Sequence, residues 1–331
     1  MNKTVLTVVL TVLLAMAFCS AYAGNSKRIG TAGALELQIP IAARGAAMGG
    51  AVMANTFGVE AMVWNPAGLA YLEGTEAMFT HLEYIADINV NYVGVANTIE
   101  DFGTIGGFAK IVSIGDMEET TQDYPNGTGR IFNPTLAIIG VSYARILTAN
   151  VSFGATAKFI NENIFEVRAT GFAVDMGFLY DPQWRGFSMG IVVKNYGPEM
   201  SFSGTGFEDL DLGDRPVAAG GASFDLPSSI NLGVAYDLVN SGQNVATWTG
   251  NFRSNNYYED LWQSGFEYTF DGKYSLRGGY NFSDEDNWLY GVSLGAGVVV
   301  DIADISLTFE YSWTETDVFS NNQFFTVKGN F

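Results

Sequence analysis

The stretch QFFTVKGNF, at positions 323–331, is the last segment of the chain and decides the fold class. Its side chains alternate between an apolar or small face (Phe325, Val327, Gly329, Phe331) and a polar face (Thr326, Lys328, Asn330). Alternate residues of a strand point to opposite sides, so such a strand suits a membrane barrel with lipid outside and water inside. We expect the closing strand of a bacterial outer-membrane barrel, with Phe325, Val327 and Phe331 as its barrel-assembly signal.

The opposite end has the three parts of an export signal. Lys3 gives a positive start, positions 5–18 form an apolar run, and AYA at 21–23 is a small-x-small cleavage site. The apolar run is shorter than the roughly 20 residues of a spanning helix. We expect residues 1–23 to be a signal peptide, with Sec-type export and cleavage near Ala23-Gly24. Lipidation at Cys19 is the alternative; after cleavage the mature chain has no cysteine for a disulfide or a thiolate.

Composition narrows the class of protein. The 331 residues carry 35 acids against 16 Lys and Arg, a net charge of −19, which argues against a nucleic-acid partner. The chain is rich in glycine, phenylalanine and tyrosine, yet only 15% of its residues are charged. After the leader, no run approaches the 18 or so consecutive apolar residues of a spanning helix. The apolar residues must therefore alternate with polar ones, as they do in barrel strands.

The alternation recurs along the chain. Positions 151–159, 172–180, 288–298 and 305–313 each have an apolar face opposite a small or polar one. From Thr75 onward we predict 14 strands in a barrel that spans 75–331, with 12 or 16 as alternatives: 75–86, 88–99, 102–115, 133–147, 150–163, 168–180, 186–195, 228–239, 243–253, 259–270, 273–283, 287–300, 303–315 and 321–331.

The predicted connections support an even barrel. Those at one end are short, whereas 116–132 and 196–227 belong to the other end, as expected of periplasmic turns and outer loops. The outer loops hold many acids, which form either a cation-attracting or docking rim or a solvated, repulsive surface. Loop 196–227 also contains four apolar residues that make it a candidate partner-binding loop: Phe202, Phe207, Leu210 and Leu212.

Residues 24–74 differ from the barrel and read as a plug inside its lumen, with a periplasmic extension as the alternative. Positions 34–40 (ALELQIP) look extended and end at Pro40. Positions 43–51 (ARGAAMGGA) are small enough for close backbone packing. Asn65-Pro66 predicts a turn in which Asn caps the next segment and Pro takes its first helical position.

Four elements between Leu35 and Ala70 carry a family resemblance: LQIP at 37–40, AR at 43–44, AMGGA at 47–51 and WNPAGLA at 64–70. In this order ahead of a barrel, they resemble the amino-terminal signature of the PorV/PorQ family, relatives of the FadL long-chain fatty-acid channels. The resemblance implies a 14-stranded antiparallel FadL-like barrel with an amino-terminal hatch. The residues that carry over are the hatch motif, for which the implied role is structural: Arg44, Met48, Gly49, Gly50, Trp64, Asn65, Pro66 and Ala67.

Two functions follow from this resemblance. PorV-like members imply a shuttle of type IX secretion, which takes cargo with a carboxy-terminal signal domain from the translocon to the surface-attachment proteins. FadL-like members imply passage of hydrophobic small molecules through a lateral opening. A general diffusion porin is disfavoured, since a plug would obstruct a barrel of this width.

The residues give no indication of catalysis, a metal or a cofactor, and we predict that the protein is not an enzyme. His81 is the single histidine, which leaves little for a catalytic triad or a metal cluster. It shares a strand side with Phe79 and Glu83, and we expect it to contact the lumen or the plug. Glycines within strands are expected to mark bends or room for the plug, and four basic side chains are expected to point inward: Lys158, Lys194, Arg277 and Lys328.

Overall fold

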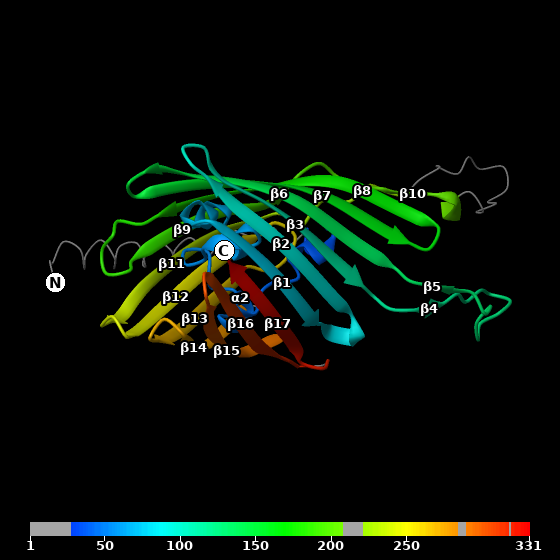
Figure 1. Ribbon diagram of the computed structural model, residues 1–331. Helices are drawn as coiled ribbons and strands as arrows, with labels where there is room; N and C mark the ends of the chain where they lie inside the picture. Colours follow the sequence, from blue (N-terminus) through cyan, green and yellow to red (C-terminus); the bar gives the residue numbers. More distant parts are fainter. Residues whose placement is uncertain (1–27, 208–220, 284–288, 318) are drawn as a thin grey trace.

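The protein is described by a computed structural model over residues 28–207, 221–283, 289–317 and 319–331. In these ranges 14 antiparallel strands form a closed barrel (Figure 1). Pairing of β1 with β17 and of β8 with β9 completes the ring. The barrel strands are β1 (Thr75–Glu83), β2 (Asn89–Ile99), β3 (Gly103–Ser113), β6 (Thr135–Thr148), β7 (Val151–Ile164), β8 (Val167–Tyr180), β9 (Ser188–Tyr196), β11 (Ser229–Asn240), β12 (Asn244–Asn255), β13 (Leu261–Phe270), β14 (Tyr274–Ser283), β15 (Tyr290–Ile302), β16 (Ile305–Thr316) and β17 (Asn322–Asn330).

The prediction of 14 strands is confirmed, and each predicted range overlaps one barrel strand. Three short strands were not predicted: β4 (Met117–Glu118) and β5 (Ile131–Phe132) form a small hairpin, and β10 (Phe202–Ser203) pairs with β8. Figure 1 shows these three strands at one end of the barrel. Because longer loops mark the outer end of an outer-membrane barrel, we call this the outer end.

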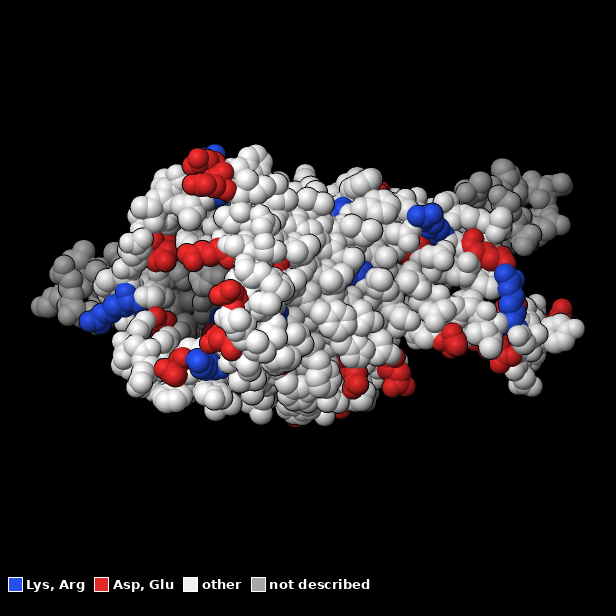
Figure 2. All heavy atoms as spheres, in the orientation of Figure 1, with Lys and Arg blue, Asp and Glu red and all other residues white. Residues whose placement is uncertain are grey.

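The two faces of the barrel wall have the distribution that the sequence predicts for a membrane barrel. Outward side chains such as Phe172 and Leu276 are both 63% exposed, whereas the inward Asp175 and Glu310 are 1% and 5% exposed. The terminal strand follows the same rule, with Phe325, Val327 and Phe331 exposed and Thr326 buried. Figure 2 shows a mostly uncharged band around the middle of the visible face, with charged side chains gathered toward the two ends. Apolar atoms outside and charges inside are the reverse of a soluble domain.

The expected position of His81 is wrong. In β1 the inward residues are Met78, Thr80 and Leu82, which are at most 2% exposed. His81 lies on the outward side beside Phe79 and contacts Asn91 on β2, with 2.9 Å between Nδ1 and Oδ1. The inward face of this strand is largely apolar because it packs on the amino-terminal segment, so polarity does not distinguish its two sides.

Residues 28–74, which we call the hatch, run through the barrel lumen from the outer end to β1. They contain one short α-helix, α2 (Ala43–Ala47), and three 3-10 helices, η1 (Leu35–Gln38), η2 (Gly58–Met62) and η3 (Pro66–Tyr71). The expectation that positions 34–40 are extended is wrong, because η1 occupies most of them. An extended segment needs the edge of a neighbouring strand for its hydrogen bonds, and a closed barrel has none to offer.

Connections at the outer end are varied. The first hairpin contains the single turn η4 (Ile85–Asp87), and η5 (Thr205–Phe207) follows β10. The connection between β3 and β6 contains the β4–β5 hairpin, in which Arg130 forms an ion pair of 2.9 Å with Glu166 of the β7–β8 turn. The predicted signal peptide, residues 1–23, lies outside the described residues. No helix in the described parts of the chain has the length and apolar character needed to cross a membrane.

Candidate functional site

Glycines on the inward wall of the barrel make room for the hatch. Gly154 on β7 and Gly177 on β8 are register partners. A Cβ atom at Gly154 would overlap the Pro66 carbonyl, and one at Gly177 would overlap the Asn65 side chain. The expectation that strand glycines leave room for the plug therefore applies at these positions.

The Asn65-Pro66 pair acts as the sequence predicts. Asn65 is the N-cap of η3: its Oδ1 accepts a hydrogen bond of 3.1 Å from the Ala67 amide, and Pro66 is the first residue of the helix. Asn65 Nδ2 also donates to the Met53 carbonyl at 2.7 Å. Ser152 Oγ on β7 donates to the Ala67 carbonyl at 3.0 Å, so this motif both begins η3 and attaches it to the wall.

The glycines at 49 and 50 allow the hatch to approach the opposite wall. Gly49 and Gly50 have φ angles of 63° and 80°, a region that glycine adopts without steric cost. A Cβ atom at Gly49 would lie 3.0 Å from the backbone nitrogen of Tyr280 on β14. Gln263 on β13 donates to the Gly49 carbonyl at 2.7 Å. The neighbouring Met48 is fully buried.

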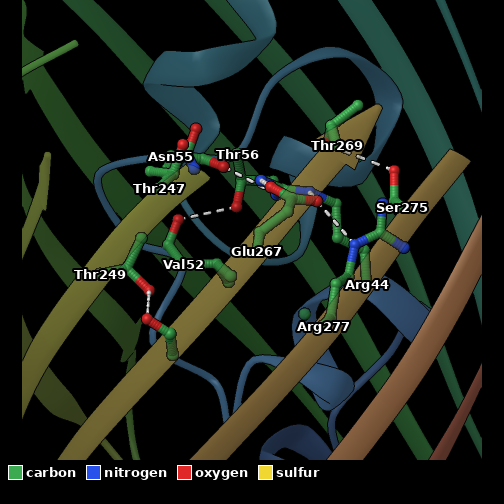
Figure 3. A network of polar contacts seen from close by, with 12 residues as sticks. Arg44, Val52, Asn55, Thr56, Thr247, Thr249, Glu267, Thr269, Ser275 and Arg277 are labelled. Atoms are coloured by element: carbon green, nitrogen blue, oxygen red, sulfur yellow. Dashed lines mark hydrogen bonds and ion pairs between the residues drawn. The ribbon is translucent and has the colours of Figure 1, made fainter. Parts of the chain in front are cut away.

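Arg44 connects the hatch to the wall through Glu267 on β13 (Figure 3). Its Nε and Nη2 donate to the two Glu267 oxygens at 3.1 and 2.7 Å, a bidentate pair, while Nη1 donates to the Asn55 carbonyl at 2.7 Å. Arg277 on β14 approaches Glu267 from the other side, with Nε 2.6 Å from Oε1. Burial acts to lower the pKa of Arg44, but the charges of Glu267 and Glu60 outweigh it and raise that pKa.

The ion pairs continue around the lumen. Arg277 contacts Glu310 on β16 at 3.0 Å, Glu310 contacts Lys328 on β17 at 3.2 Å, and Lys328 contacts Glu60 of η2 at 3.5 Å. We call these residues the latch cluster: Arg44, Glu60, Glu267, Arg277, Glu310 and Lys328. Three positive and three negative side chains balance one another, so the cluster itself has no net charge.

Trp64 is a hatch residue that lies between the hatch segment around Gly45 and strand β9. Its indole Nε1 donates to the Ile41 carbonyl at 3.1 Å, and its ring packs against Gly45. Lys194 on β9 donates to the Val63 carbonyl at 2.7 Å, with its Nζ 5.6 Å from the centre of the Trp64 ring. Trp64 thus joins the two hatch segments that the sequence motif spaces 20 residues apart.

A cavity of about 490 Å³ lies above the hatch. Its wall comes from the outer parts of the strands, including Phe108 and Lys110 on β3, and its floor from hatch residues that include Gly50 and Trp64. The connections at the outer end contribute Tyr84 and Tyr258, and Tyr290 is the first residue of β15. A largely apolar cavity with a few converging polar groups is the usual form of a ligand site.

The other predicted site residues have different positions. Phe202, on β10, packs against Phe224 with ring centroids 5.6 Å apart, and both rest on the core that contains the hatch. Phe207 is in η5, while Leu210 and Leu212 lie outside the described residues. The inward orientation expected of Lys158, Lys194, Arg277 and Lys328 is confirmed by their contacts in the lumen.

The carboxylates of the latch cluster were not predicted. Alternation places Glu310 on the small, polar face of its strand, which is the inward one. Its ion-pair partners, Arg277 and Lys328, lie on two other strands, β14 and β17. The pair Arg44–Glu267 joins residues that are 223 positions apart in the sequence. The sequence signal that could have identified Glu310 is an acidic residue on the inward face of a barrel strand.

The match to a known family covers most of the chain. The family model of the type IX secretion system protein PorV matches residues 22–252. The chain belongs to the PorV family. No curated protein gives a significant match to it.

Solved structures show that this PorV-family chain has the FadL-like fold. The toluene transporter TodX of Pseudomonas putida is 13% identical, with a TM-score of 0.57 over 87% of this chain and 98% of that one. A FadL homologue of Pseudomonas aeruginosa is also 13% identical, with a TM-score of 0.54 over 88% and 98%. The toluene transporter TbuX of Ralstonia pickettii is 14% identical, with a TM-score of 0.54 over 88% and 98%. At these sequence identities the similarity shows the fold alone. The barrel fold and the PorV family together indicate that the protein is located in the outer membrane.

We expect the double substitution Asn65→Ala with Pro66→Ala to loosen η3. It removes the N-cap and the preset backbone angle of the first helical residue, and the loss of such a cap typically costs about 1 kcal/mol. Single-channel recordings in planar bilayers should show raised conductance through a less firmly seated hatch. Conductance equal to that of the unsubstituted protein would contradict a sealing role for this turn.

Proposed function

We propose that this protein is a cargo-binding shuttle of type IX secretion rather than an open pore. The observation that carries the proposal is the latched hatch in a chain of the PorV family: six charged side chains, each at most 14% exposed, fix the hatch across the lumen. A conduit for folded or unfolded protein needs a wide lumen, whereas a carrier needs only a surface that binds its cargo. The partners are then the translocon, cargo with a carboxy-terminal signal domain, and surface-attachment proteins.

The outer end supplies surfaces that such partners need. Ile131 and Tyr124 of the β3–β6 connection are 65% and 63% exposed, next to several carboxylates. Exposed apolar side chains rimmed by charge are typical of interaction sites. Phe202 and Phe224, in contrast, pack over the hatch, which favours a capping role for that part of the loop predicted to bind partners.

Capture of a cargo signal domain tests the proposal. The full-length protein, tagged and extracted in mild detergent from cells that secrete by the type IX route, should co-purify with cargo that has its carboxy-terminal domain. The same cargo without that domain is the matched control and should be lost. Equal recovery of both cargoes, or of neither, while the barrel remains folded, would contradict the shuttle.

The second candidate is a channel for hydrophobic small molecules. The specific observation in its favour is the largely apolar cavity above the hatch, which is lined by Phe108, Ile138 and Phe324 among others. A deletion strain should then take up long-chain compounds more slowly, and the gene supplied in trans should restore uptake. Unchanged uptake together with lost secretion would leave the shuttle as the function.

The predicted export signal gives a separate expectation. We expect the protein recovered from outer membranes to begin at Gly24, because signal peptidase cleaves after a small-x-small sequence. Intact mass and amino-terminal sequencing measure this directly. Ala23→Gln should slow processing and leave the precursor in the inner membrane, whereas Tyr22→Gln, at the tolerant central position, is the matched control.

A further inference from the structure

Three basic side chains that line the cavity have no carboxylate partner. Lys110 on β3, Lys194 on β9 and Arg253 on β12 form no ion pair within 4.0 Å in the described parts of the chain. The other inward bases, in contrast, are all paired: Lys158 contacts Asp175 at 2.6 Å, and Arg44, Arg277 and Lys328 belong to the latch cluster. The charge of Glu36 acts on Lys110, and that of Asp175, which is itself paired with Lys158, acts on Lys194, whereas no acid of the described residues acts on Arg253.

Neutral oxygens occupy part of the hydrogen-bonding capacity of these three cations. Lys110 Nζ donates to the Glu36 and Ile39 carbonyls at 2.6 and 2.7 Å, Lys194 to the Val63 carbonyl at 2.7 Å, and Arg253 Nε to Asn231 Oδ1 at 3.0 Å. A carbonyl orients an ammonium group but does not neutralise it. Buried charges in proteins are normally paired, so an anion in this cavity would stabilise all three.

The cavity faces outward and is blind at its inner end. Its rim is formed by connections at the outer end of the barrel, including Tyr84 and Tyr258, and its floor by Ala46, Gly50 and Trp64 of the hatch. The latch cluster lies on the inner side of this floor, at Glu267, Arg277, Glu310 and Lys328 of the strands. A ligand that enters from outside and leaves by the same route needs no movement of the hatch.

We propose that this cavity binds the carboxy-terminal end of an extended polypeptide presented from outside the cell. The terminal carboxylate contacts Lys194 and Arg253, and the apolar lining of the cavity receives the last side chains. This proposal rests on the proposed shuttle function and specifies which part of the cargo enters the barrel. A fatty acid offers the same carboxylate but no peptide backbone, so decanoate serves as the competing ligand in the test.

Arg253 is the residue to change, because its described hydrogen bond is to a barrel side chain and not to the hatch. Arg253→Gln removes the charge. Arg168→Gln is the matched control: Arg168 is an exposed residue of β8 whose Nε likewise donates to one asparagine, Asn161. The full-length protein in lipid nanodiscs is titrated with a fluorescein-labelled peptide that ends in valines, as the free acid and as the amide, and binding is followed by anisotropy.

The free acid is expected to bind about tenfold more tightly than the amide, the value of one good charge-assisted contact. Arg253→Gln should reduce this difference several-fold, because Lys194 keeps its contact with the carboxylate, and Arg168→Gln should preserve it. Equal affinity of acid and amide for the unsubstituted protein would overturn the proposal. So would decanoate binding without peptide binding, which would assign the site to free amphiphiles.

The outcome is separable from that of the shuttle itself. If the protein captures no cargo but binds the free-acid peptide more tightly than the amide, the shuttle function is contradicted and the peptide site is supported. Capture of cargo that is unaffected both by Arg253→Gln and by an amidated cargo terminus would leave the shuttle and remove the site.

Discussion

Arg44→Met is expected to release the hatch from the barrel wall and to open the lumen to ions. The substitution keeps most of the side-chain length but removes the bidentate pair with Glu267 and the hydrogen bond to Asn55. Removal of one partner from a buried ion pair costs about 3–5 kcal/mol, because the other charge stays buried. Since Arg277 retains its contact with Glu267, the barrel wall itself keeps an ion pair at this point.

Two measurements separate hatch release from unfolding. Conductance in planar bilayers should rise strongly, while heat-modifiable migration in gels should show that the barrel remains folded. Arg145→Met, at an exposed outward position of β6, is the matched control and should leave conductance unchanged. Glu267→Gln should reproduce much of the effect, and the double variant should cost less than the sum of the singles, since contacting residues are not additive. A closed, fully sealed Arg44→Met barrel would contradict the latch.

Gly154→Leu should prevent the hatch from seating at all. A Cβ atom at this position overlaps the Pro66 carbonyl, and backbone at a closely packed turn has little room to move. The strand itself tolerates leucine, because β7 already alternates larger residues on both faces. We therefore expect a folded barrel with a displaced hatch, and a larger increase in conductance than the loss of one ion pair gives.

Limited proteolysis distinguishes this result from general destabilisation. The hatch of Gly154→Leu should be cut rapidly while the strands stay protected. Gly278→Leu, on the outward side of β14 where a Cβ atom has its nearest neighbour 3.7 Å away, is the matched control and should be cut no faster than the unsubstituted protein. Rapid cleavage of both variants, or of neither, would show that the fit between η3 and the wall does not depend on Gly154.

Strand number and the direction of most side chains follow from the sequence. The period of two is a local property of each strand, and a lipid-facing side must be apolar whatever its neighbours are. Stretches such as 172–180 and 305–313 therefore show their outward side directly. The turn at Asn65-Pro66 could also be predicted from local sequence, because the Asn65 side chain caps the amide of Ala67, only two residues away.

The failures occurred where another part of the chain decides the structure. The expected inward position of His81 is wrong: β1 has apolar residues on both faces, and several of the inward ones are apolar because the hatch packs on them. Positions 34–40 alternate like a strand but form η1, since the closed wall offers their backbone no partner.

By itself the sequence determined a 14-stranded outer-membrane barrel preceded by a segment with the PorV signature. Only the tertiary structure decided which inward charges meet. The latch pairs join residues more than 200 positions apart between hatch and wall, and the unpaired Lys110, Lys194 and Arg253 come together from three separate strands. The physical reason is that the energy of interaction between two charges depends on the distance between them and on their burial. The closure of the barrel sets both, and the spacing of the residues along the chain does not.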